Sequence, residues 1–126
     1  DTVLMIYEFS AGTECYELGL TKGKIDKGET PIEAASRELK EEIGYGANKF
    51  TFLKTITLAP GYQSNTTHIV LAEDLYEEVA EGDEPEPLEI VTHKLSNLEK
   101  LTYDEDLTEA RSILALYMVR EIIRNR

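Results

Sequence analysis

The chain has 126 residues, a length that suits one domain with its own hydrophobic core. Its formal net charge of −12 argues against a nucleic acid or an acidic membrane surface as a partner, because both attract basic proteins. The sequence has no run of about 18 apolar residues, so no membrane-spanning helix is expected. The single cysteine, Cys15, cannot form an intramolecular disulfide, and this favours a cytoplasmic location.

Two strands are expected at the start of the chain. Residues 3–9 are rich in β-forming side chains, and residues 15–20 follow after a turn. Residues 21–28 are mostly polar and contain two glycines, which indicates a loop. This loop leads into the segment with the clearest helical signals.

A helix is predicted over residues 31–43. Thr30 is a suitable N-cap, Pro31 fits the first helical position, and Glu33 completes a capping box with Thr30. Gly44 is expected to end the helix. Apolar residues at three- and four-residue spacing predict one apolar face, which consists of Ile32, Ala35, Leu39 and Ile43.

Three further strands and a second helix are expected after this helix. The strands are predicted at residues 50–58, 67–71 and 88–95. The acidic segment 77–87 is expected to be a loop, and Asp106 with Glu109 indicates the cap of the second helix. The apolar side of that helix contains Ala110, Ile113, Leu114, Tyr117 and Ile122. This arrangement predicts an α/β or α+β sandwich with a mixed sheet between helices.

Three glutamates of the first helix form an acidic cluster. Glu38 and Glu42 are one helical turn apart, and Glu41 lies in the same arc beside the apolar face. Like charges at this spacing destabilise a helix by roughly a few tenths of a kcal/mol per pair, so a compensating group is expected. Carboxylate oxygens are the ligands that Mg²⁺ and Mn²⁺ prefer, and Arg37 is placed to pair with Glu41 or Glu29. The alternative is an acidic face that is simply exposed to solvent.

The residues around this cluster have the spacing of a known motif, the Nudix box. In that motif a glycine is followed after five residues by a glutamate and, after seven more, by Arg-Glu-apolar-x-Glu-Glu-x-Gly-apolar. The fixed positions are all matched, by Gly23, Glu29, Arg37, Glu38, Leu39, Glu41, Glu42 and Gly44. Only Tyr45 departs, at a position where an aliphatic residue is usual. The chain therefore resembles the Nudix hydrolases, which implies an α/β/α sandwich with a mixed β-sheet and metal-dependent cleavage of a nucleoside-linked diphosphate.

The resemblance implies a role for each residue of the box. The expected ligands of Mg²⁺ or Mn²⁺ are Glu38, Glu41 and Glu42. A backbone carbonyl near Gly23 is a further expected ligand, and Glu29 and Arg37 are expected to hold the loop against the helix. The residues expected to maintain the structure of the box are Gly23, Glu29, Arg37, Leu39 and Gly44.

Similarity continues outside the box, in residues 12–23, 38–48 and 81–88, where the chain is similar to the ADP compounds hydrolases of the Nudix family. That group hydrolyses ADP-ribose, NADH and short diadenosine polyphosphates and releases AMP. The resemblance implies an ADP-containing small molecule as substrate and a homodimer. It also implies that the single domain of residues 1–126 lacks an N-terminal segment that relatives carry before the position of Asp1.

The catalytic base and the substrate contacts are less closely defined by the motif. Related enzymes often use a glutamate of the acidic loop as the base, which makes Glu84 and Glu86 candidates beside Glu41. The candidate substrate contacts are Lys22, Gly23, Pro60 and Arg111. Each candidate has a structural alternative, as an exposed loop acid, a turn residue or a member of a surface ion pair.

Three functional hypotheses follow. The first is hydrolysis of ADP-linked compounds, either by an ADP compounds hydrolase or by a generic ADP-ribose pyrophosphatase. Residues 17–23 depart from the pattern of the generic ADP-ribose pyrophosphatases. The second is a Nudix domain that binds a nucleotide without cleaving it, and the third is an acidic protein-interaction domain. The complete set of three glutamates favours the enzyme, because a binding module has no need of clustered metal ligands.

Overall fold

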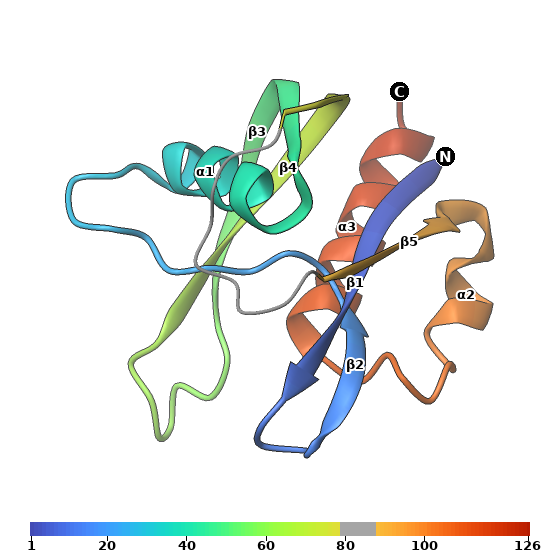
Figure 1. The fold of residues 1–126 in the computed structure, drawn as a ribbon. Helices are drawn as coiled ribbons and strands as arrows, with labels where there is room; N and C mark the ends of the chain where they lie inside the picture. Colours follow the sequence, from blue (N-terminus) through green and yellow to red (C-terminus); the bar gives the residue numbers. More distant parts are fainter. Residues whose placement is uncertain (79–87) are drawn as a thin grey trace. The chain divides into compact units, whose positions relative to one another are not determined.

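The computed structural model describes residues 1–78 and 88–126, which belong to two compact units (Figure 1). The first unit contains Asp1–Thr21 and the described residues of Glu84–Arg126. The second contains the described residues of Lys22–Asp83. The candidate bases Glu84 and Glu86 lie outside the described residues. Within the described ranges, no helix combines the length and the apolar character needed to cross a membrane.

The first unit is built on a three-stranded antiparallel sheet with the strand order β2-β1-β5. Its strands are β1 (Thr2–Ser10), β2 (Cys15–Gly19) and β5 (Glu89–Lys94). The strands predicted at 3–9, 15–20 and 88–95 are confirmed to within one residue at each end. β-forming side chains between turn or loop segments therefore located these strands correctly.

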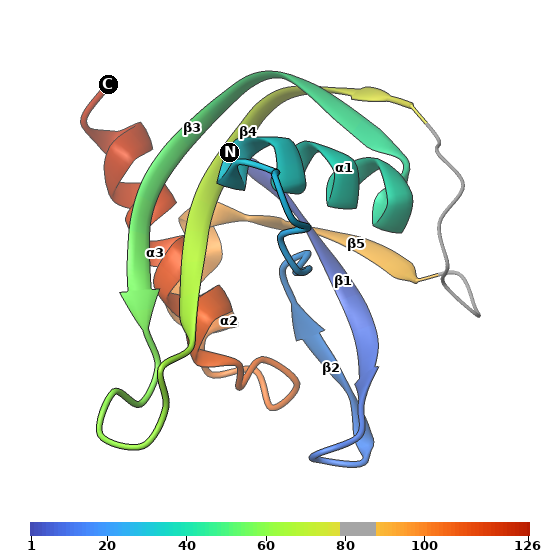
Figure 2. The same ribbon diagram turned by 90° about the vertical axis from the view of Figure 1, so that its left-hand side faces the viewer.

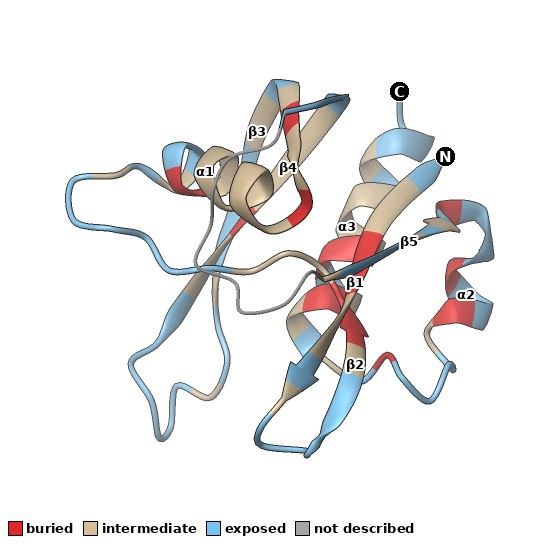
Figure 3. Ribbon diagram, in the orientation of Figure 1, coloured by how far each residue is buried: buried red, intermediate tan, exposed pale blue. Residues whose placement is uncertain are grey.

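The core of the first unit joins this sheet to three helical segments, η1 (Leu95–Asn97), α2 (Leu98–Leu101) and α3 (Ala110–Arg124). Figure 3 shows that buried residues concentrate there. The buried members of the core are Met5, Leu18, Leu95, Leu98, Leu101, Leu107 and Leu116. The sequence did not predict η1 and α2, although the leucines at three-residue spacing between 95 and 101 are their signal.

The cap of α3 differs from the predicted one. Glu109 is the N-cap residue, and its carboxylate accepts hydrogen bonds from the backbone N–H groups of Arg111 (3.0 Å) and Ser112 (3.1 Å). The prediction that Asp106 forms part of the cap is wrong. Leu107 is buried in the core between Asp106 and the helix, so Asp106 comes too early in the chain to reach the first helical turn.

The second unit consists of helix α1 (Pro31–Ile43) and the antiparallel pair of β3 (Tyr45–Thr57) and β4 (Thr66–Glu77), with α1 packed mainly against β3. The predicted helix boundaries are confirmed. Figure 2 shows both strands curving over α1. Of the predicted apolar face, Ile43 is buried, whereas Ile32 is 36% exposed. Ala34, which was not predicted to belong to that face, is buried.

Both strands of the second unit are longer than the predicted 50–58 and 67–71. β3 begins directly after Gly44, whose φ of 72° turns the chain out of the helix. Gly46 is buried, and a Cβ there would lie 2.6 Å from the ring of Tyr76 on β4. Cross-strand packing of this kind, rather than local β propensity, extends the strand through residues of low propensity.

Within each unit, the described strands pair in antiparallel fashion. Each of these pairs lies within one unit, so the pairs do not test the predicted mixed sheet. β1 with β2 and β3 with β4 are consecutive strands with short connections, and such connections suit antiparallel pairing. The combination of strands and helices agrees with the predicted α+β class.

Candidate metal-binding site

Helix α1 carries the acidic cluster, and both of its ends are capped as predicted. Thr30 Oγ1 accepts a hydrogen bond from the Glu33 N–H (3.1 Å), and Glu33 Oε1 accepts one from the Thr30 N–H (2.9 Å). At the other end, the Gly44 N–H donates to the Lys40 carbonyl oxygen (3.1 Å). The caps fix the first and the last residue of the helix, and the regular helix between them fixes the direction in which each glutamate side chain leaves it.

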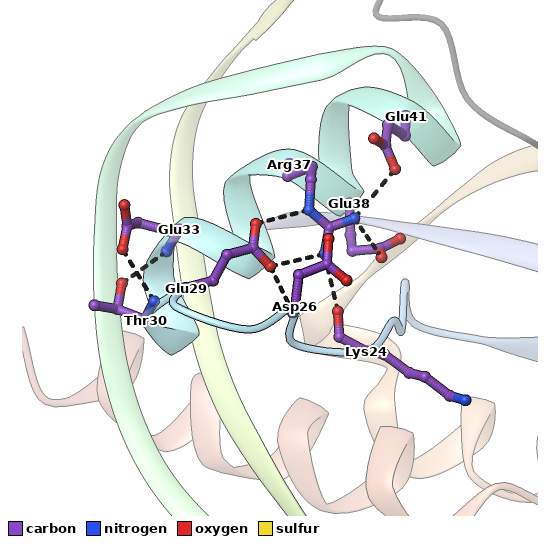
Figure 4. Close-up of polar contacts among 8 residues, drawn as sticks. All are labelled: Lys24, Asp26, Glu29, Thr30, Glu33, Arg37, Glu38 and Glu41. Atoms are coloured by element: carbon purple, nitrogen blue, oxygen red, sulfur yellow. Dashed lines mark hydrogen bonds and ion pairs between the residues drawn. The ribbon is translucent and has the colours of Figure 1, made fainter.

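Arg37 lies at the centre of the polar contacts between α1 and the preceding loop (Figure 4). Its Nε donates to Glu29 Oε2 (2.8 Å) and its Nη2 donates to Glu29 Oε1 (3.0 Å), a two-point pairing that suits a planar guanidinium. Nη2 also donates to the Lys24 carbonyl oxygen (2.9 Å). The predicted pairing of Arg37 with Glu29 is confirmed, and it fastens the loop to the helix.

The same guanidinium holds two glutamates of the acidic cluster. Arg37 Nη1 donates to Glu38 Oε1 (2.8 Å) and to Glu41 Oε2 (3.3 Å). Hydrogen bonds to Glu29 and then to Glu38 raise the pKa of Arg37 further above its usual value. The hydrogen bond from Arg37 is in turn the main reason why the pKa of Glu29 is lowered. The pair of Arg37 and Glu29 is therefore charged at neutral pH.

Gly23 allows the backbone of the loop to approach the acidic cluster. A Cβ at this position would overlap the Glu38 carboxylate. The Glu38 side chain therefore lies directly against the backbone of Gly23, which is a contact that only glycine permits here. The residues of the box that the structure brings together are Gly23, Glu29, Arg37, Glu38 and Glu41.

The acidic cluster offers carboxylate oxygens, the donor type that suits Mg²⁺ or Mn²⁺. Oxygens of Glu38 and Glu41 both accept a hydrogen bond from Nη1 of Arg37, so two candidate metal ligands face the same guanidinium cation. One oxygen of Glu42, Oε2, is buried. Among residues 1–78 and 88–126, no three His, Cys, Asp or Glu side chains come together as a group that could hold a metal ion. The donor chemistry thus fits a hard divalent cation, while full convergence of like-charged carboxylates is expected to need the ion's own charge.

Two of the predicted substrate contacts, Pro60 and Arg111, belong to different units. Pro60 is in the turn between β3 and β4, where the Ala59 carbonyl oxygen accepts a hydrogen bond from the Tyr62 N–H (2.9 Å). Arg111 is at the start of α3, where its Nε donates to Glu109 Oε2 (3.0 Å). Arg111 therefore takes part in an ion pair, the structural alternative to a substrate contact.

Asp26 is a contributor to the site that the sequence did not reveal. Its N–H donates to Glu29 Oε1 (2.8 Å), and the Glu29 N–H donates back to its carbonyl oxygen (3.0 Å). Its carboxylate lies 3.5 Å from Arg37 Nη2. The Asp-x-x-Glu spacing at 26–29 is the signal for this turn, and it orients Glu29 for Arg37.

An open groove of about 490 Å³ lies beside α1. It is lined by Ile32, Glu33, Ser36, Arg37, Lys40 and Glu41 of α1 and by Phe50 of β3. Arg37 and Glu41 belong both to this groove and to the contacts of the acidic cluster. Of the three glutamates of the acidic cluster, only Glu41 is among the residues that line this groove.

Comparison with known proteins agrees with these features. The sequence matches the NUDIX domain over residues 1–117. It is 52% identical to the ADP compounds hydrolase NudE of Escherichia coli (strain K12) over 126 residues, which cover 100% of this chain and 68% of that protein. It is 34% identical to the ADP-ribose pyrophosphatase of Bacillus subtilis (strain 168) over 116 residues, which cover 90% of this chain and 63% of that protein.

The structure is similar to a crystal structure of ADP compounds hydrolase. The TM-score is 0.94 at 52% sequence identity, and the match covers 99% of this chain and 68% of that chain. The chain thus spans about two thirds of the length of these relatives. The box, the agreement in sequence and the agreement in structure all lead to the same family. The chain belongs to the Nudix hydrolase family and has the Nudix fold.

Proposed function

We propose that the chain hydrolyses the diphosphate bond of ADP-linked small molecules, such as ADP-ribose, NADH or diadenosine polyphosphates, and releases AMP with the help of a divalent cation. The observation that carries the proposal is the convergence of Glu38 and Glu41 on Arg37 within a complete Nudix box. Further support comes from relatives that are named as an ADP compounds hydrolase and an ADP-ribose pyrophosphatase.

A cation is required by the charge of the chain and of its proposed substrate. The chain has a net charge of −12, so an anionic diphosphate would be repelled without a cation between the two. The residues proposed to hold this cation are Glu38, Glu41 and Glu42. When bound, Mg²⁺ or Mn²⁺ neutralises the diphosphate and lowers the pKa of an attacking water molecule.

The residues of the chain contribute mainly positioning. Arg37 orients Glu38 and Glu41 through its hydrogen bonds, and Gly23 leaves the space that Glu38 occupies. Displacement at phosphorus depends chiefly on positioning and on charge neutralisation, so this arrangement is the relevant contribution. The proposed bases are Glu41, Glu84 and Glu86, and the proposed substrate contacts are Lys22, Gly23, Pro60 and Arg111.

Glu42→Gln tests the proposal most directly. This change keeps the size of the side chain but removes its charge, and we expect AMP release from ADP-ribose to fall by at least about 100-fold, because changes beside metal ligands already cost about 10- to 100-fold. The matched control is Glu105→Gln, which makes the same change at an exposed loop position of the first unit. Activity would be measured by chromatography of AMP with Mg²⁺ and with Mn²⁺. An unchanged rate in Glu42→Gln would remove Glu42 from the proposed ligands.

Three other outcomes would change the proposal itself. Nucleotide binding in calorimetry without any product would indicate a non-catalytic Nudix module. Failure to bind any divalent cation would favour the hypothesis of an acidic protein-interaction domain. Activity on ADP-ribose alone would indicate a generic ADP-ribose pyrophosphatase. The homodimer and the cytoplasmic location expected from the sequence stay predictions.

A further inference from the structure

The outer edge of β2 and of the residue that follows it is hydrogen-bonded by Asp106, which precedes α3, and by Ser112 in the first turn of α3. β2 is an edge strand of its sheet, and an edge strand presents N–H and C=O groups that need partners. The Leu18 N–H donates to the Asp106 carbonyl oxygen (2.9 Å). Just beyond the strand, the Leu20 N–H donates to Ser112 Oγ (3.0 Å). Alternate N–H groups of an extended chain point to the same side, so the Ser112 hydroxyl takes the place that a strand carbonyl would occupy.

Ser112 is buried where it makes this contact. Within residues 1–78 and 88–126, it is the only polar or charged residue that is buried, with 2% of its surface exposed. Its Oγ accepts the Leu20 N–H and donates to Glu109 Oε1 (3.0 Å). A buried hydroxyl is costly unless it is hydrogen-bonded, and this one is bonded both as acceptor and as donor.

Glu109 keeps the Ser112 hydroxyl in this orientation. Burial on its own would raise the pKa of Glu109, but hydrogen bonds from Arg111 and Ser112 outweigh it and lower the pKa. The carboxylate is therefore charged at neutral pH and acts as an acceptor only. Since the hydroxyl proton of Ser112 is directed at Glu109, its lone pairs remain available to the Leu20 N–H.

We propose that Ser112 is a positioning residue that fixes the backbone at Leu20 and thereby the course of the chain into Gly23. Only two residues separate Leu20 from Gly23, and the Gly23 backbone lies against the Glu38 carboxylate. A displaced backbone at residues 20–23 would shift the surroundings of Glu38. The inference rests on the proposed function in so far as Glu38 is a metal ligand of the hydrolase.

Ser112→Ala removes the acceptor and tests this role. We expect kcat to fall on the order of 10-fold with KM changed by less than about 2-fold, because small displacements of reacting groups act on the rate and an ångström costs up to about 100-fold. Ser112→Thr keeps the hydroxyl and is expected to restore most of kcat. The matched control is Thr108→Val, which removes the nearby hydrogen bond from Thr108 Oγ1 to Glu17 Oε1 (2.7 Å) and is expected to keep the unmodified kcat. A folded Ser112→Ala protein with unchanged kcat would overturn the proposal.

Amide hydrogen exchange tests the same contact without using activity. In the unmodified chain, the Leu20 N–H is expected to be protected to a similar degree as the Leu18 N–H, although it lies beyond the end of β2. Rapid exchange of Leu20 would overturn the proposal even if Ser112→Ala did not fold. In a folded Ser112→Ala chain, exchange is expected to become faster at residues 20–23 and to stay unchanged in β1.

The two experiments separate the inference from the proposed function. If the unmodified chain releases no AMP, the proposed function fails, while protection of Leu20 still supports the anchoring by Ser112. If AMP is released but Leu20 is unprotected, the inference fails and the proposed function stands.

Discussion

The carboxylates of the acidic cluster have different surroundings although all of them lie on α1. Glu38 is packed against Gly23 and bonded by Arg37, with 18% of its side chain exposed. Glu41 is also bonded by Arg37 but borders the open groove, and one oxygen of Glu42 is buried. Because surroundings control both the charge and the direction of a carboxylate, the properties of this cluster depend on residues outside it, above all on Gly23 and Arg37.

Gly23→Ala is expected to weaken metal binding. The new Cβ would overlap the Glu38 carboxylate and displace it. We expect the affinity for Mn²⁺, measured by isothermal titration calorimetry, to fall by about 10- to 100-fold. Gly12→Ala is the matched control, because nothing lies within 4 Å of a Cβ at that position. Equal affinities of the two variants would show that this contact does not place a metal ligand.

The ion pair of Glu29 should make the stability of the chain depend on pH. The hydrogen bond from Arg37, followed by that from the Asp26 N–H, lowers the pKa of Glu29 below its usual value of 4.5. A carboxyl with a lowered folded-state pKa stabilises the fold fully above its unfolded pKa, and this stabilisation is lost as the pH falls through the folded pKa. The unmodified chain should therefore exceed Glu29→Gln in free energy of unfolding by a constant amount near neutral pH and by a decreasing amount below about 4.5.

Urea denaturation of both chains over a series of pH values measures this difference. A gap in the free energy of unfolding that stays constant down to strongly acid pH would contradict the assignment of the pKa shift to Glu29.

Among the elements, α1 is defined mostly by its own sequence, and the hairpin that follows is defined by pairing. The capping box of Thr30 and Glu33 and the left-handed Gly44 mark the ends of the helix. The change of direction at Gly44 sends the chain directly into β3, which then runs to Thr57 beside β4. The C-terminal cap of the helix is thus also the starting point of the strand.

Gly44→Ala should destabilise the second unit through this cap. Alanine at a φ of 72° is disfavoured by about 1–2 kcal/mol because its Cβ approaches the backbone carbonyl oxygen. We expect a decrease of that size in the free energy of unfolding measured in urea. Gly61→Ala serves as control, since its Cβ meets nothing within 4 Å and its φ is not positive. A similar loss in both variants would mean that the cap geometry is not the cause.

For the whole molecule, the excess of acidic over basic residues is the dominant physical property. The chain has 25 Asp and Glu residues against 13 Lys and Arg residues, a formal net charge of −12. Such an excess opposes compaction by self-repulsion, and cations that bind the folded chain oppose that effect. Metal binding should therefore be visible in stability as well as in activity.

Addition of Mn²⁺ is expected to raise the Tm of the unmodified chain. A ligand at about 100 times its Kd stabilises the folded state by about 2.7 kcal/mol when it does not bind the unfolded chain. Differential scanning calorimetry with MnCl₂, and with NaCl at equal ionic strength, separates specific binding from screening of charge. Glu42→Gln should lose most of the specific increase. An equal increase in both chains would indicate binding elsewhere on the acidic surface.

The short helices and the long strands show where prediction from the sequence ended. η1 and α2 occupy residues 95–101, where three leucines at three-residue spacing are the only helical signal, and so short a stretch also resembles the end of a strand. The start of β3 includes Gly46 and Ala47, which have low β propensity, and they form a strand because Tyr76 and Leu75 of β4 pair with them. In both cases the decisive interactions come from residues distant in the chain.

The family, the helix with its caps, and Glu29 and Glu41 as possible partners of Arg37 could be predicted from the sequence, because each depends on residues close together in the chain at fixed spacing. Which distant groups meet is known only from the folded structure. It placed Glu38 against Gly23, buried Ser112 beside Leu20, and made Glu109 the cap of α3 in place of Asp106. These contacts depend on close packing and on the saturation of buried hydrogen-bonding groups, and neither leaves a periodic signal in the sequence.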